Sequence, residues 1–226
     1  MATNKPVGVE RSFVRHDFKV APLDLRWQTL SVTINRPRAP PVLALQPCSG
    51  AMETGSLLAA MGPSGGGKTT LLNALAHRGP SSGGEVLYGG SVWSARLKRR
   101  VGVVEQDDQV LQQLTVGESL RFAAALRLSH LTPAAREARV ASLLAILRLA
   151  SCEGTQVGDS TSAASRGISG GERKRLCIAC ELLTMPSLLF LDEPSSGLDS
   201  SMAYVRAVAL SSRHECFDTW AQGRLH

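Results

Sequence analysis

The chain of 226 residues lacks several features, and each absence argues against a class of protein. It has no apolar run near the roughly 18 residues that a membrane-spanning helix needs, so the sequence predicts no transmembrane segment. The first 20 residues are rich in charge and contain no apolar stretch, which argues against a secretory signal. Aromatic residues make up only 4% of the chain, so base stacking on single-stranded nucleic acid is not supported.

Cysteine is scarce, and its pattern argues against a zinc site. Cys177 and Cys180 form a lone C-x-x-C without a second pair or two histidines at a suitable spacing. Small buried side chains in a reducing compartment are the simpler interpretation. The net charge of +6 permits a nucleic acid or an anionic membrane as partner. The densest basic run, 96–100, is interpreted as a solvated turn before a strand, and no nucleic acid is expected.

The chain is long enough for one α/β domain with a real core. Its apolar patterns predict an N-terminal group of strands, then a glycine-rich turn with its helix, a helical insertion, and a final buried strand. A loop is expected at Arg36–Pro41, because three prolines are unsuited to a sheet. The expected strands are 25–34, 42–50, 56–61, 85–88, 101–104 and 188–191, and the expected helices are 69–77, one from 115, 132–150 and 169–183.

A glycine-rich segment, Gly62–Thr69, fits the pattern G-x-x-x-x-G-K-[ST] of phosphate-binding loops. Glycines let successive backbone N–H groups turn towards phosphate oxygens, and the start of a helix adds partial positive charge. We expect Lys68 to contact the β- and γ-phosphates of ATP, and the Thr69 hydroxyl to bind Mg²⁺. The predicted nucleotide contacts are Gly62, Pro63, Ser64, Gly65, Gly66, Gly67, Lys68, Thr69 and Thr70.

Two adjacent acids, Asp192 and Glu193, follow the apolar run Leu188–Leu191. Carboxylates at the end of a buried strand are costly unless a cation or a reaction uses them. Asp192 suits Mg²⁺, directly or through water. Glu193 suits polarising an attacking water as a general base.

Further segments resemble motifs of the ATP-binding cassette family. Ile168–Arg175 resembles the family's signature motif, Ser196–Asp199 resembles the D-loop, and Gln106 within Val103–Asp108 resembles the Q-loop glutamine. The sequences of these motifs are most similar to those of subfamily G, the half-transporters of the white and sterol or multidrug type. The resemblance covers roughly Leu25–Ala203.

The resemblance implies a fold and a set of roles. The fold is α/β, a P-loop NTPase cassette with a mixed sheet core, N-terminal antiparallel strands and an α-helical signature subdomain. The domain is expected at 25–203, after a flexible lead-in at 1–24 and before a divergent tail at 204–226. In this family two cassettes bind ATP head to tail. Catalytic roles are implied for Lys68, Gln106 and Glu193, Mg²⁺ binding for Thr69, Gln106 and Asp192, and ATP contacts across the dimer for Ser169, Gly170, Gly171, Glu172 and Asp199.

The same resemblance implies partners and a location. The chain is expected to form a homodimer, or a heterodimer with another half-transporter, on the cytoplasmic side of a membrane. The membrane domain is expected in trans or lost. The leading hypothesis is a Mg-ATPase that powers transmembrane transport.

The sequence also departs from the family pattern. The position of the adenine-stacking aromatic is Val32, with Trp27 nearby but out of register. The likeness fades after Tyr204, and neither His214 nor His226 is expected to serve as the family's switch histidine. A truncated product is therefore a hypothesis, and one alternative function is an ATP-binding module with little turnover that associates with full-length half-transporters. Another is a soluble cassette ATPase acting on nucleic acid, which the subfamily-G wording disfavours.

Overall fold

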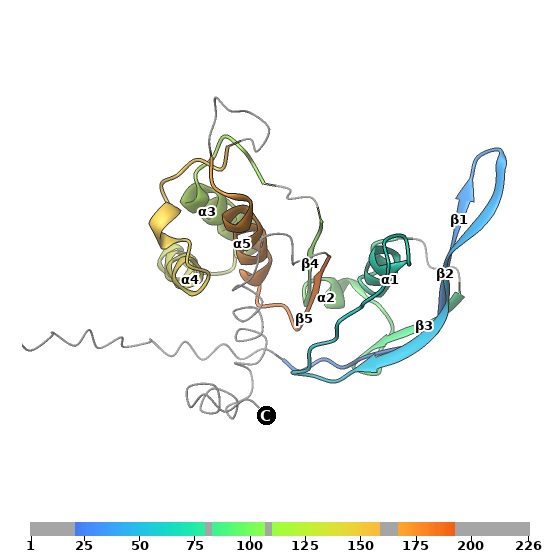
Figure 1. The fold of residues 1–226 in the computed structure, drawn as a ribbon. Helices are drawn as coiled ribbons and strands as arrows, with labels where there is room; N and C mark the ends of the chain where they lie inside the picture. The colour runs from blue at the N-terminus through green and yellow to red at the C-terminus, as the bar shows by residue number, and fades with distance from the viewer. Residues whose placement is uncertain (1–20, 80–82, 107–109, 159–166, 193–226) are drawn as a thin grey trace, which may run out of the picture.

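The computed structural model describes residues 21–79, 83–106, 110–158 and 167–192, which form a sheet lobe, a helical lobe and two strands between them (Figure 1). Among these residues, no helix is both long and apolar enough to cross a bilayer. The elements are β1 (Leu25–Arg36), β2 (Ala39–Met52), α1 (Lys68–Leu75), β3 (Gly83–Tyr88), α2 (Ala95–Lys98), β4 (Val101–Val104), α3 (Val116–Arg127), α4 (Pro133–Ile146), a short 3₁₀ turn (Ala150–Cys152), α5 (Gly170–Leu182) and β5 (Leu188–Leu191).

The sheet lobe is an antiparallel sheet with the strand order β2-β1-β3. Its loop prediction at Arg36–Pro41 is wrong, because β1 continues to Arg36 and β2 begins at Ala39, before Pro40 and Pro41. Within the described sheet β2 is an edge strand, where a missing N–H need not break the ladder. The pairing with β1 also shifts between Ile34 and Arg36, and this irregularity accommodates the prolines.

The parallel pair β4 and β5 lies between two hydrophobic cores, with Val104 opposite Leu191. Leu188 and Phe190 belong to the core of the sheet lobe, whereas Leu189 and Leu191 pack against the core of the helical lobe. Because side chains alternate along a strand, a strand that is apolar at every position can serve both cores. The two strands therefore join the lobes.

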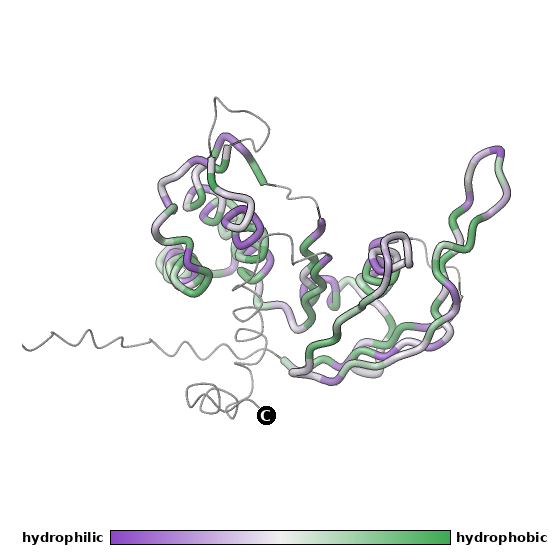
Figure 2. The backbone as a smooth tube through the Cα atoms, viewed as in Figure 1, coloured by the Kyte–Doolittle hydropathy of each residue, from purple (hydrophilic) through white to green (hydrophobic). Residues whose placement is uncertain are grey.

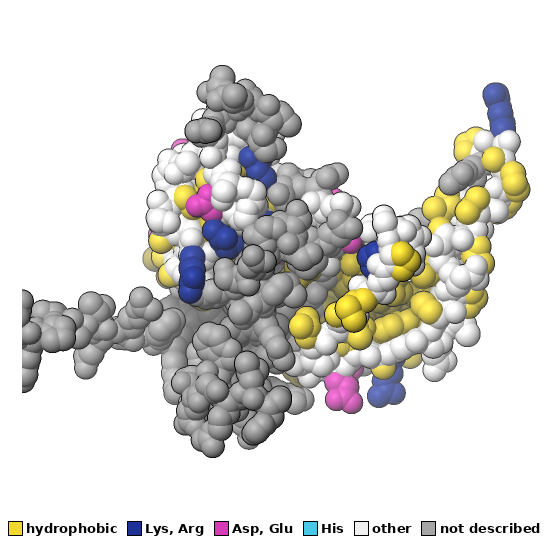
Figure 3. All heavy atoms as spheres, viewed as in Figure 1, with side chains coloured by type: hydrophobic (Ala, Val, Ile, Leu, Met, Phe, Trp, Pro, Cys, Tyr) yellow, Lys and Arg dark blue, Asp and Glu magenta, His cyan; other side chains and the backbone are white. Residues whose placement is uncertain are grey.

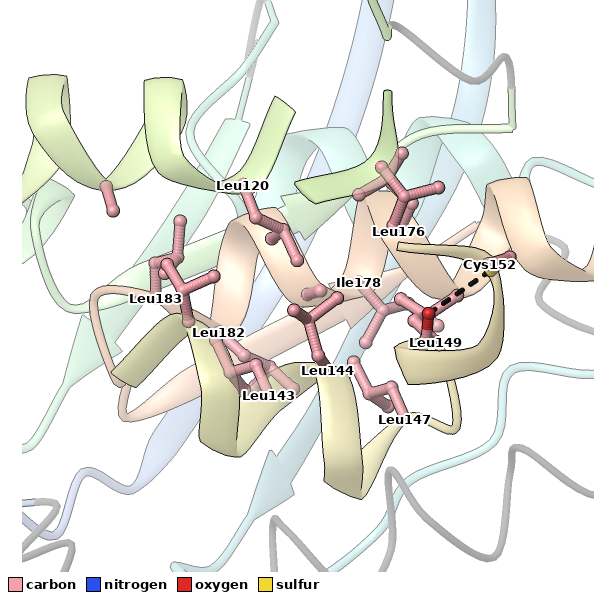
Figure 4. Close-up of a cluster of buried hydrophobic side chains, with 14 of the residues drawn as sticks. Leu120, Leu143, Leu144, Leu147, Leu149, Cys152, Leu176, Ile178, Leu182 and Leu183 are labelled. Atoms are coloured by element: carbon pink, nitrogen blue, oxygen red, sulfur yellow. Dashed lines mark hydrogen bonds between the residues drawn. The ribbon is translucent and has the colours of Figure 1, made fainter. Parts of the chain in front are cut away.

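The helical lobe packs α3, α4 and α5 around leucine side chains (Figure 4). Leu120, Leu176 and Ile178 have no measurable exposure, and burying one such side chain stabilises the fold by about 1.5–3 kcal/mol. Cys177 and Cys180 pack against this core, and burial raises the pKa of the Cys180 thiol to about 11. The two cysteines were interpreted as small buried side chains, and in the structure both are partly buried.

The segment before α1 differs from its prediction. Residues 56–61 were expected to form a strand, but the structure assigns them no strand, and the side chains of Leu57, Leu58 and Met61 are 55%, 52% and 90% exposed. Figure 2 shows this stretch as an apolar approach to α1, and in Figure 3 apolar side chains gather on the adjoining surface of the sheet lobe. An apolar run becomes a strand only when a neighbour offers hydrogen bonds, and no described strand pairs with this one.

Candidate functional site

The phosphate-binding loop, Gly62–Thr69, leads directly into α1. Gly65 and Gly67 have φ angles of 78° and 82°, in the left-handed region that glycine adopts readily. The N–H of Gly66 donates to the carbonyl of Pro63 at 3.1 Å, which closes a tight turn. The glycines predicted from the sequence are therefore used where the backbone curls.

The start of α1 leaves its backbone donors without a side-chain cap. The N-cap is Gly67, which has no side chain to accept from the first turn, and the first turn contains no acidic residue. The first N–H groups of a helix have no acceptor within the helix, and the helix dipole places partial positive charge there. This arrangement fits an anion such as a phosphate group.

Lys68 sits at the first position of α1, and its side chain curls back over the loop. Its Nζ donates to the carbonyls of Gly62 at 3.0 Å and Pro63 at 2.8 Å. The ammonium is therefore held beside the loop and the start of α1. Together they supply positive charge from a side chain and from the helix start at one place.

Thr69 and Asp192 meet at the same site although 123 positions separate them. The Thr69 hydroxyl donates to Oδ1 of Asp192 at 3.2 Å, and Asp192 is 9% exposed. The N–H of Asp192 donates to the carbonyl of Val104 at 3.0 Å, so the end of β4 holds this residue in place. The structure thus brings together the hydroxyl and the carboxylate that the sequence predicted as Mg²⁺ ligands.

This pair of oxygen ligands suits a magnesium ion that also binds phosphate and water. It does not suit a metal site made of protein ligands alone. Mg²⁺ prefers oxygen ligands and binds through one or two protein groups plus phosphate oxygens and waters. The described residues contain no group of three or more His, Cys, Asp or Glu side chains placed to hold a metal. Gln106 lies two residues beyond the end of β4, and Asp192 lies one residue beyond the end of β5. Parallel strands end at the same edge, so these two predicted ligands share that edge.

The second surface predicted to contact a nucleotide lies at the start of α5. Ser169 is the N-cap and forms a complete capping box with Glu172, as its spacing predicted. The backbone N–H and the hydroxyl of Ser169 donate to Oε2 of Glu172 at 2.8 and 2.7 Å. The hydroxyl of Ser169 and its backbone N–H lower the pKa of Glu172, in that order of size. In Figure 1, α5 and α1 lie on opposite sides of β4 and β5.

Neither residue considered for adenine stacking offers a free face. Val32 and Trp27 are 2% and 6% exposed and belong to the core of the sheet lobe. Their burial leaves base stacking, if it occurs, to other residues.

Two predicted site residues, Glu193 and Asp199, lie outside the described residues. The basic run 96–100 behaves largely as predicted, since Arg96, Lys98 and Arg99 are exposed around α2. Arg100 differs, because it donates to the Ser187 hydroxyl and to the carbonyls of Ala21 and Pro22.

Two basic residues of α5 are buried, which their residue types did not predict. Arg173 and Lys174 are 7% and 4% exposed, although Arg and Lys normally face solvent. Arg173 donates to the carbonyls of Val157 and Gly158. A signal existed for Lys174, because it falls on one helical stripe with Ile178 and Leu182, spaced four residues apart.

Sequence comparisons with known proteins identify the family of this chain. The family described as ABC transporter matches residues 45–196. ABC transporter G family member 22 of Arabidopsis thaliana is 48% identical over 158 residues, which cover 69% of this chain and 21% of that protein. ABC transporter G family member 7 of the same plant is 42% identical over 191 residues, 81% of this chain and 26% of that protein. Protein white of Drosophila melanogaster is 45% identical over 173 residues, 74% of this chain and 25% of that protein. The chain spans 21–26% of the length of these three relatives.

Proposed function

The chain belongs to the ABC transporter family, as an ATP-binding cassette of subfamily G, and from this membership we propose that it binds Mg-ATP and hydrolyses it to power transmembrane transport. The observation that carries the proposal is the contact between Thr69 and Asp192 beside the uncapped start of α1. It places the expected magnesium ligands next to the expected phosphate donors.

Each residue of this site has a proposed part in binding. The backbone N–H groups of 64–70 and the ammonium of Lys68 bind the phosphates, with Gly62 and Pro63 lining the loop and Thr70 in the first turn of α1. Thr69 and Asp192 offer oxygen ligands to Mg²⁺, and Gln106 adds an amide at the same strand edge. Bound Mg²⁺ neutralises charge that develops on the phosphate oxygens. Glu193 is proposed to accept a proton from the attacking water.

A second copy of the cassette is proposed to complete the site. Ser169, Gly170, Gly171 and Glu172 begin a helix whose dipole favours phosphate. They lie across β4 and β5 from the chain's own α1, which supports a role towards ATP bound by a partner. Asp199 is proposed to join that interface. The partner is a second copy of this chain or another half-transporter, at the cytoplasmic face of a membrane beside a membrane domain.

The test measures Mg-ATP hydrolysis by the purified chain at several protein concentrations, with Glu193→Gln as the inactive control. The proposal predicts that specific activity rises with concentration, because a composite site needs two chains, and that the control binds ATP without turnover. ATP binding with no turnover above the control would support the alternative, an ATP-binding module that associates with half-transporters. Absence of ATP binding in the wild type would contradict both.

A further inference from the structure

Two basic residues within the signature motif, Arg173 and Lys174, face inwards. Arg173 and Lys174 are among the few charged side chains that are buried in the described part of the chain. A buried charge is costly unless it is paired or fully hydrogen-bonded. The contacts of Lys174 therefore indicate what this residue is for.

Lys174 connects α5 to the segment that follows β4. Its Nζ donates to the carbonyl of Glu105 at 2.7 Å and to the carbonyl of Gln106 at 3.0 Å. Hydrogen bonds from a charged donor are shorter and stronger than those between neutral groups. One side chain of α5 thus fixes two consecutive peptide groups. Lys174 lies 69 positions after Glu105 and 68 positions after Gln106 in the chain.

The same segment is tied to α1 from its other side. Arg78, three residues after the end of α1, pairs with the Glu105 carboxylate at 2.7 Å. The two side chains are 44% and 43% exposed, and solvent screens an exposed ion pair so that it contributes little. The buried contact from Lys174 is therefore a stronger restraint on this segment than the exposed ion pair with Arg78.

We propose that Lys174 is a positioning residue for Gln106. It fixes the backbone of Gln106 at the edge where β4 and β5 end, beside the proposed magnesium ligands. It also makes that edge move together with α5, the helix that begins in the signature motif. The inference rests on the proposed function, because it takes Gln106 as a ligand of the Mg-ATP site. Groups that orient a metal ligand commonly change metal-dependent affinity or activity by about 10–100-fold when removed.

A lysine that served only the packing of α5 would behave differently. Replacing it with methionine, which is similar in length and apolar, would then change the stability of the chain and leave its response to Mg²⁺ intact. A positioning role predicts instead that the response of ATP affinity to Mg²⁺ is lost selectively.

The experiment compares the full chain with Lys174→Met, Lys174→Arg and Arg78→Met. ATP affinity is titrated calorimetrically in EDTA and in excess Mg²⁺, and the ratio of the two affinities is the readout. Lys174→Met should keep its affinity in EDTA within about twofold and lose about tenfold of the gain from Mg²⁺. Lys174→Arg should recover much of that gain, and Arg78→Met, the control acting on the same Glu105, should match the wild type.

A double variant distinguishes a shared effect on Gln106 from a general effect on folding. Gln106→Ala should lose the same gain, and Gln106→Ala combined with Lys174→Met should lose no more, because both changes act through the same proposed magnesium ligand, the Gln106 side chain. A Lys174→Met chain that retains the full gain, or additive losses in the double variant, would overturn the inference and leave the proposed function standing. A wild type that binds no ATP would overturn both.

Discussion

The starts of α1 and α5 are the two surfaces expected to face phosphate, and they are built in opposite ways. Helix α1 has Gly67 as its N-cap, with no side-chain cap and no acid in its first turn. Helix α5 has Ser169 as its N-cap, and the capping box with Glu172 occupies two of the backbone donors there. The first backbone N–H groups of α1 have no side-chain acceptor among the described residues, so its start is open. At the start of α5, side chains of the capping box accept from two of the backbone N–H groups.

This difference separates binding within the chain from binding between chains. The open donors of α1 gain most from an anion, because nothing in the described chain caps them. The capped start of α5 is already stable, and only its remaining donors and its dipole are left for a ligand. We therefore expect α1 to dominate ATP affinity, and α5 to act mainly when a second chain brings its nucleotide.

The largest effect should come from Lys68→Met at the open start. Removing the ammonium deletes charged hydrogen bonds to phosphate worth about 1.5–3 kcal/mol each, so ATP affinity should fall about 100-fold. Titration calorimetry with ATP measures it. The control is Lys98→Met, an exposed lysine at the end of α2, which should bind as the wild type does. Equal losses in the two variants would mean that net charge, and not the loop, governs affinity.

A second effect should follow from adding one methyl group at each helix start. In Gly67→Ala the new Cβ would lie 3.2 Å from the Ala44 carbonyl, at a φ of 82°. The left-handed backbone alone should cost about 1–2 kcal/mol, and ATP affinity should fall as the loop shifts. Gly170→Ala is the matched control, because its Cβ would meet nothing within 4 Å, and it should be neutral or stabilising by about 0.4–1 kcal/mol. Denaturant unfolding distinguishes them.

Ser169→Ala tests the capped start and should have a smaller effect. Losing an N-cap hydroxyl typically costs about 1 kcal/mol of stability. Thr115→Ala removes the equivalent hydroxyl from the capping box of α3 and should cost a similar amount. Both variants should keep wild-type ATP affinity at concentrations too low for dimerisation. Weakened ATP binding by Ser169→Ala alone under those conditions would contradict the division of roles between the two helices.

The smallest effect concerns the charge of Glu172. The hydrogen bonds from Ser169 lower its pKa from the ordinary value of 4.5. The charged form is therefore favoured by folding, and its stabilisation is present above that value and lost as pH falls through the lowered pKa. Glu172→Gln keeps a capping-box side chain, so it should cost only a few tenths of a kcal/mol near pH 7.

The control for this prediction is the pH profile itself. The difference in unfolding free energy between wild type and Glu172→Gln should shrink as the solution is acidified below about pH 4. A difference that stays constant from pH 7 to pH 3 would show that the charge of Glu172 does not contribute.

Local patterns predicted much of this arrangement. The bounds of β4 and β5 match the apolar runs at 101–104 and 188–191, and the caps of α3, α4 and α5 lie at Thr115, Thr132 and Ser169, where the residue types placed them. Caps and buried runs depend on neighbours a few positions away, which a sequence displays directly.

The failures depend on neighbours that are distant in sequence. Pro40 and Pro41 are tolerated because β2 is an edge strand, and edge position is a property of the assembled sheet. Residues 56–61 have the composition of a strand but no described partner. The contact of Lys174 with Glu105 and Gln106 joins segments far apart in the chain, and only its place on an apolar helical stripe hinted at burial.

The central claim is that the open start of α1, completed by Thr69 and Asp192, is a Mg-ATP site. It is tested most directly by titrating ATP into the wild type and Asp192→Asn, each in EDTA and in excess Mg²⁺. We predict that Mg²⁺ tightens ATP binding by the wild type and not by Asp192→Asn. In EDTA the variant should bind ATP at least as well as the wild type, because a negative charge beside the phosphates has been removed. Equal tightening by Mg²⁺ in both chains would contradict the account.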